Sequence, residues 1–130
     1  MAVPTVATFS AAAIIAAHTS LKNLIDGGSS NGKIRVRNSA DVLLADVPLV
    51  DPCGTVNGTT GQLVFAISGP DTSADVSGTA AYVEFVDSDN VVYLSLPAIQ
   101  GTAPVSGKVV FNTLTITETL PVTALSATVG

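Results

Sequence analysis

The sequence predicts a mainly-β protein, a β-sandwich or barrel-like domain, with one short α-helix near its N-terminus. Two patterns favour this fold class. From residue 33 onward, short apolar segments alternate with polar positions and are separated by turn residues. Before that point, residues 11–25 are rich in good helix formers. The chain has the length of one domain, so we expect a single domain over residues 1–130.

An extended arm and then the helix are predicted for the first residues. Residues 1–9 carry β-branched side chains and Pro4, which favour an extended arm. Ser10 is a good N-cap, so we expect the helix over residues 10–26. Gly27 follows directly and suits the left-handed position that ends many helices.

One stripe of this helix is predicted to pack against a neighbour. The stripe consists of Ile14, His18, Leu21 and Ile25, which follow one another at spacings of four, three and four residues. A catalytic or metal-binding role for His18 would need partner ligands, and the chain has no second histidine. We therefore expect His18 to be partly buried in a packing interface. The stripe serves either the core or a contact with another subunit.

The β-domain is predicted over residues 33–130. Its expected strands are 33–37, 42–50, 63–67, 81–86, 92–96 and 110–118, with a last strand or an extended tail at 122–129. Turn-rich or polar segments separate them at 52–61, 71–78 and 97–107. Strands this short and this regularly spaced indicate a sandwich or a barrel.

Three segments carry more specific predictions. Asp46 and Pro48 interrupt the second strand, so we expect it to be bent or to lie at a sheet edge. The turn at residues 87–90 indicates a hairpin between its flanking strands. Residues 110–118 alternate most cleanly, and Pro121 ends that pattern.

Composition limits the partners of this chain. Its formal net charge is −5, which argues against nucleic acid, because binding of phosphates depends on Lys and Arg. The purely apolar run at residues 11–17 is far shorter than a membrane-spanning helix. No basic residue precedes that run, so it does not have the pattern of a signal peptide. We expect no nucleic acid or membrane partner, and a product made in the cytoplasm.

Basic residues gather on one predicted strand face. Lys33, Arg35 and Arg37 alternate with Ile34 and Val36, so all three point to the same side. One interpretation is a solvated face paired with the chain's own acids. The other is a docking strip for an acidic neighbouring subunit, since charge complementarity sets orientation. Both stay open at the level of sequence.

Residues with catalytic or metal-binding chemistry are sparse. Two acidic pairs occur in polar turns, Asp71 with Asp75 and Asp87 with Asp89, and turn chemistry explains them more simply than a bound cation. Cys53 is the single cysteine, and its sequence neighbours supply no positive charge, so it is predicted to be a packing or loop residue. We expect no enzyme activity, no cofactor and no metal.

Several segments occur in the same order as in small structural proteins of tailed bacteriophages, which this chain resembles over about three-quarters of its length. They are residues 24–36, 43–49, 51–52, 61–65, 71–75 and 78–89. The first contains a helix end, a Gly/Ser connector and a Lys-hydrophobic-Arg strand. These phage proteins have a longer Gly/Pro-rich loop where this chain has only residues 38–41.

The resemblance implies a virion component that binds other proteins. It favours a head decoration (cement) protein on the capsid surface, assembled in the host cytoplasm, which contacts the major capsid protein and copies of itself. A tail-associated role comes next. Candidate contact residues are Lys33, Arg35, Arg37, Ile14, His18 and Leu21. Alternatives are a bacterial fimbrial or adhesin-type subunit and a small tail hydrolase or lectin.

Overall fold

The computed structural model describes residues 9–130 and shows a mainly-β protein with one helix in that part of the chain. The predicted arm at residues 1–9 falls outside the described residues except for Phe9. The elements are α1 (Ala11–Ile25), β1 (Lys33–Arg37), β2 (Leu43–Val56), β3 (Leu63–Ile67), β4 (Gly78–Thr79), β5 (Tyr82–Val86), β6 (Val92–Gln100), β7 (Lys108–Phe111), β8 (Thr115–Ile116) and β9 (Ala124–Val129).

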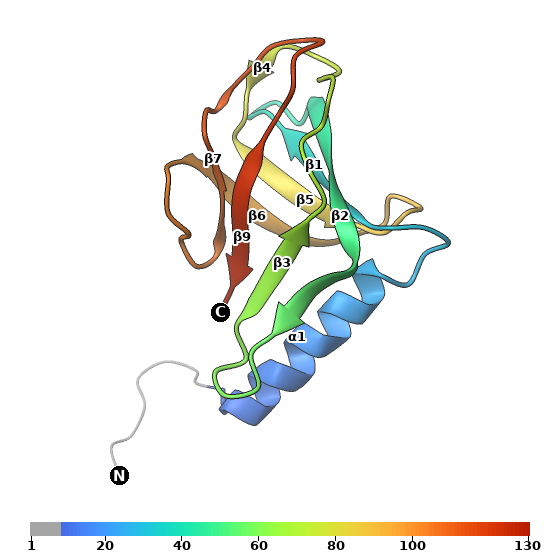
Figure 1. The fold of residues 1–130 in the computed structure, drawn as a ribbon, viewed down its shortest axis with the longest axis vertical. Coiled ribbons are helices and arrows are strands. Elements are labelled where there is room, and N and C mark those ends of the chain that lie inside the picture. Colours follow the sequence, from blue (N-terminus) through green and yellow to red (C-terminus); the bar gives the residue numbers. More distant parts are fainter. Residues whose placement is uncertain (1–8) are drawn as a thin grey trace.

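Seven strands form a barrel in the order β1-β2-β3-β9-β7-β6-β5, and the pairing of β5 with β1 closes it (Figure 1). The predicted hairpin is confirmed: β5 and β6 are antiparallel neighbours joined by the turn at residues 87–91. The predicted last strand is also confirmed, because β9 lies between β3 and β7. Barrel closure leaves no free outer strand among these seven.

One neighbouring pair, β6 and β7, is parallel despite a short connection. Parallel neighbours usually need a crossover of about a dozen residues or more. Here residues 101–107 return along the outside of the barrel: the Thr128 hydroxyl donates to the Val105 carbonyl, and the Gly107 amide donates to the Thr128 carbonyl. This loop covers part of β7 and β9.

Inward-facing side chains of the strands fill the barrel. In β1, Ile34 and Val36 are fully buried while the alternating basic residues Lys33, Arg35 and Arg37 face outward, as the alternation predicts. Phe65 of β3 stacks on Phe85 of β5, with ring centroids 4.2 Å apart. This stacked pair spans the interior between strands that are not neighbours in the sheet.

The helix crosses one end of the barrel (Figure 1). Its N-cap is Ser10, whose hydroxyl accepts a hydrogen bond from the Ala13 amide, as expected from the sequence. A Cβ on Gly61 would lie 2.6 Å from Ile14, and one on Gly32 would lie 2.6 Å from Ile25. These close approaches bring α1 against the β2–β3 turn and against the start of β1.

The opposite end is covered by the segment that carries β4 and by β8 (Figure 1). Asp71 and Val122 exchange two main-chain hydrogen bonds, and Ala74 bonds with Leu120 and Thr119 in the same way. Small and apolar side chains of this cover join the core; they are Ala74, Ala80, Ile116 and Val122.

Three predicted strand boundaries are wrong. The long strand at residues 110–118 is split into β7 and β8, because the chain leaves the barrel there and the Leu114 carbonyl accepts from the Ala80 amide of the cover. The second strand is bent, as predicted, but it is not at an edge and it continues to Val56. The register shift between Leu49 and Gly54 lets it pass from β1 to β3.

β6 also extends to Gln100, through residues predicted to be loop. The Ala98 amide donates to the Ala81 carbonyl, just before β5. Because successive backbone nitrogens of a strand point to opposite sides, the nitrogen of Pro97 points away from β5, toward the β7 side. The pairing with β7 begins only at Ala98. Proline therefore removes no ladder hydrogen bond at this position.

Gly27 does not adopt the left-handed conformation that we predicted for it. The helix ends instead with Asp26 as a right-handed C-cap, and the Gly27 amide donates to the Leu24 carbonyl at 3.2 Å. The last turn is thus tightened, and the Leu24 carbonyl receives its hydrogen bond without a left-handed glycine.

Gly61 offers a test of the helix docking. It has φ +80°, and its Cβ position is occupied by Ile14. We expect Gly61→Ala to lower the free energy of unfolding by about 2 kcal/mol, from backbone strain and the clash with α1. Urea denaturation measures this change.

Gly58 provides the matched control, because nothing lies within 4 Å of its Cβ position. Gly58→Ala should leave the unfolding midpoint within experimental error of the wild type. Equal effects of the two substitutions would contradict the proposed contact between Gly61 and α1.

Candidate functional site

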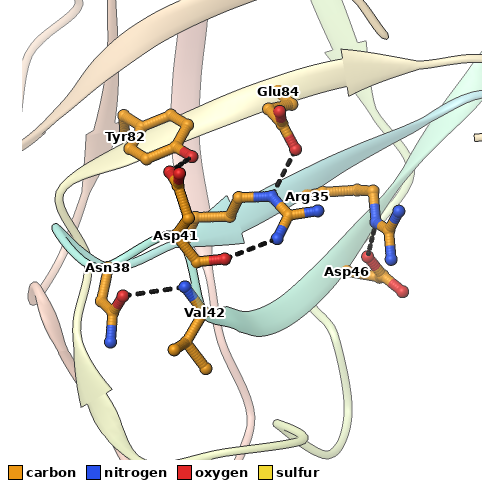
Figure 2. Close-up of polar contacts among 8 residues, drawn as sticks. Arg35, Asn38, Asp41, Val42, Asp46, Tyr82 and Glu84 are labelled. Carbon is orange, nitrogen blue, oxygen red and sulfur yellow. Dashed lines mark hydrogen bonds and ion pairs between the residues drawn. The ribbon is translucent and has the colours of Figure 1, made fainter. Parts of the chain in front are cut away.

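The predicted basic strip lies on the outer face of β1, between β2 and β5 (Figure 2). Arg35 is in register with Asp46 on one side and with Glu84 on the other. The site is therefore a sheet surface on which three adjacent strands present charged side chains.

Arg37 is held by two partners. Its Nε donates to Glu84 Oε1, and its Nη1 donates to the Asp41 carbonyl at 2.8 Å. The hydrogen bond to Glu84 raises the pKa of Arg37 further above its ordinary value. The guanidinium thus connects β5 to the β1–β2 turn, which carries Asp41.

Tyr82 reinforces the same turn. Its hydroxyl donates to Asp41 Oδ1, and this bond raises the pKa of Tyr82 (Figure 2). Asp41 has φ +64°, a left-handed conformation that Asp tolerates better than most residues. Asn38 closes the turn, since its Oδ1 accepts from the amides of Ala40 and Val42 at 2.9 Å.

Arg35 pairs with Asp46 rather than with a residue of β5. Arg35 Nε lies 3.4 Å from Asp46 Oδ1, and both atoms are shielded from solvent. The Asp46 amide also donates to Asp71 Oδ2 at 2.9 Å, which fixes the far cover of the barrel to β2. This ion pair therefore lies where the sheet and the cover meet.

Most of the strip is neutralised by the chain itself. Arg35 and Arg37 have acidic partners on neighbouring strands, as in the first interpretation from the sequence. Lys33 is in register with Pro48 and Val86, and forms no ion pair with the described residues. Docking of an acidic neighbour on this strip stays a prediction.

The helix residues chosen as contacts face this chain's own barrel. His18 Nδ1 donates to the Gly61 carbonyl at 2.5 Å, and its ring lies beside Gly130. Leu21 packs on the core. Ile14 lies against Gly61. Of the two roles left open for this stripe, the structure shows the one within the subunit.

The opposite face of α1 is the surface that the sequence analysis missed. It is exposed and carries no charged side chain; its residues are Ala12, Ala13, Ala16, Ala17, Thr19, Ser20, Asn23 and Leu24. Leu24 is 47% exposed, and Phe9, just before the helix, is 74% exposed. The signal was present in the sequence, because Lys22 is the single charged residue of this helix. We call these residues, with Phe9, the outer helix face.

Cys53 is a packing residue, as predicted. It is buried, and burial, followed by the nearby Asp26, raises the pKa of its thiol to about 12. Its amide donates to Asp26 Oδ1 at 2.9 Å, and Lys22 bridges to the other oxygen of that carboxylate. The cluster joins the end of α1 to β2.

The acidic pairs show the predicted turn chemistry. Asp87 Oδ1 accepts from the amides of Asp89 and Val91, and Tyr93 donates its hydroxyl to Oδ2. Asp71 accepts in the same way from Ser73. No group of side chains that could hold a metal, and no cavity, is found among residues 9–130.

Comparison with known proteins finds no matching family model, no matching curated protein and no matching solved structure. Among residues 9–130, no helix is long and apolar enough to cross a membrane.

The ion pair of Arg37 with Glu84 can be measured by a double-mutant cycle. The two side chains are 21% and 17% exposed, so solvent screens them incompletely. We expect Arg37→Gln, Glu84→Gln and the double variant to give a coupling free energy of about 1 kcal/mol, reduced by added salt. A cycle of Lys33→Gln with Glu84→Gln is the control and should give no coupling. Zero coupling for Arg37 would contradict the pairing.

Asp87 predicts an acid-sensitive turn. Its hydrogen bonds, that with the Val91 amide first, hold its folded-state pKa below the ordinary value. A carboxylate whose pKa is lower in the folded state stabilises the fold at any pH above its unfolded-state pKa of about 4. This contribution is lost as the pH falls through the folded-state pKa. Asp87→Asn should therefore flatten the loss of stability below about pH 4.

Urea midpoints between neutral pH and acid would measure this effect. Asp89→Asn is the matched control, because Asp89 contributes its amide to the turn. It should follow the wild-type pH profile. The turn assignment would be wrong if the two variants behaved alike.

Proposed function

We propose that this chain is a structural virion protein of a tailed bacteriophage, a head decoration protein that binds the assembled shell and bridges neighbouring capsomers. Segments of this chain resemble segments of small phage structural proteins and occur in the same order, and this resemblance supplies the phage context. The observation that carries a binding role is the outer helix face, an exposed and uncharged surface beside a barrel whose arginines are already paired.

The outer helix face has the chemistry of a protein contact. Charged residues are depleted at the centre of protein interfaces, and this face has none. Its alanines allow the close approach of another backbone, while Leu24 and Phe9 offer larger apolar side chains at either end. The inner stripe of α1 fixes the helix to the barrel, so the outer face is presented on a rigid support.

Stabilisation of the shell would follow from linkage. A subunit that binds only assembled capsomers lowers the free energy of the assembled state, by about 2.7 kcal/mol per site at a concentration of 100 times Kd. No chemical step is required, and the subunit acts by the surface that it covers.

Quantitative mass spectrometry of purified virions tests the location. We expect a copy number that is a simple fraction or multiple of the major capsid protein. A low number would instead indicate the tail, and absence from virions would overturn the proposal in favour of a surface adhesin.

Add-back to heads that lack this chain tests the surface. Wild-type protein should raise the temperature at which the heads disrupt, whereas Ala16→Glu and Leu24→Glu should bind weakly because each places a charge in the contact. Ser106→Glu, on an exposed loop residue outside the helix, is the control and should act as the wild type. Full activity of the helix variants would exclude this face.

A further inference from the structure

We infer that β9 is an exchangeable strand, and that the partner it fits is the β3–β7 slot of a second copy of this chain. The inference rests on how β9 is held and does not depend on the proposed function. In the closed barrel, β9 is the strand that joins β3 to β7. Its release would open the barrel at one place and expose one strand edge on each side.

The seam between β3 and β9 is short. Two residue pairs form it, Leu63 with Val129 and Val64 with Thr128. Beyond them, the two chain segments next pair at the isolated bridge of Asp71 with Val122. Within the described residues, no ladder pairing joins the stretches 65–70 and 123–127, which lie between these two points. For comparison, β1 pairs along its whole length with both of its neighbours.

Small side chains anchor β9 in the core. In the core, β9 buries Ala124 and Ala127, and Val129 packs against them partly buried, whereas the neighbouring β7 buries Val109 and Phe111. Thr128 is buried under the 101–107 loop on the outside of the barrel. Burial of apolar area is the main force that retains a strand, and alanine supplies little of it. Ser126 adds a cost, because its hydroxyl is shielded from solvent and has no hydrogen-bond partner.

The chain just before β9 is firmly attached, so the strand has a defined hinge. Val122 exchanges two hydrogen bonds with Asp71, and Leu120 accepts from the Ala74 amide. Only Thr123 separates Val122 from the start of β9. A strand released at this hinge can still form the same backbone pairs and bury the same side chains. The surface that fits it best is therefore the slot between β3 and β7 of another copy. Such an exchange of an identical element between copies is domain swapping.

Hydrogen exchange on the full chain tests the release. Amides of residues 124–129 should exchange about tenfold faster than the slowest amides of β1 and β5, through opening that leaves the rest of the barrel closed. Exchange of β9 at the same rate as β1 and β5 would overturn the inference, because it would show that β9 opens only with the whole fold.

A disulfide lock tests the exchange between copies. In a Cys53→Ala background, Val109→Cys with Ala127→Cys would link β7 to β9 at directly paired residues. The control, Val36→Cys with Val83→Cys, would link β1 to β5 at a matched buried pair. Isotope-labelled and unlabelled chains are mixed at high concentration and examined by native mass spectrometry.

We expect mixed dimers or longer assemblies from the wild type and from the oxidised β1–β5 variant, and none from the oxidised β7–β9 variant until it is reduced. Mixed assemblies that persist in the oxidised β7–β9 variant would overturn the inference, because they would form through another surface. Fast exchange of β9 amides without any mixed assembly would overturn the assignment of a second copy as the partner.

Discussion

The structure depends on the packing of α1 across one end of the barrel. Ile25 is fully buried there, and Gly32 leaves no room for a Cβ, with Ile25 at 2.6 Å and the Val86 carbonyl at 2.8 Å. The other half of the helix meets Gly61 and Gly130. The helix therefore packs across the ends of β5, β1, β2, β3 and β9, which follow one another around the barrel.

This packing gives the two faces of α1 different roles. The stripe with Ile14, His18 and Leu21 serves the subunit itself, and a change there would act on stability first. The outer helix face is exposed to solvent and makes no such contribution. Periodicity alone identifies the apolar stripe, but the more informative feature is the missing charge on its opposite side.

The fold class and several local features were predictable from the sequence, but the tertiary partners of individual segments were not. The Ser10 cap, the alternation in β1 and the β5–β6 hairpin each depend on a few adjacent residues, and all three occur. The split of residues 110–118 depends on a hydrogen bond from Ala80, far away in the sequence. Strand propensity carries no information about such a partner.

The charged strip shows the same limit. Its common face follows from the period of a strand, but its neutralisation needs the register of β1 with β2 and β5, which places Asp46 and Glu84 beside Arg35. The sequence contains these acids without indicating their neighbours. The interpretation of a basic surface therefore depended on a register that only the folded sheet supplies.

Barrel closure has a consequence for how each copy is made. It pairs Leu63 with Val129, across half of the chain, so β3 leaves the ribosome long before β9 does. Hairpins such as β5–β6 form from neighbouring segments and can assemble early, whereas such non-local pairing is slow. A nascent chain thus passes through a stage in which the sheet is nearly complete and two strand edges are unpaired. At that stage, the concentration of other copies and the access of chaperones decide whether the chain folds as a monomer.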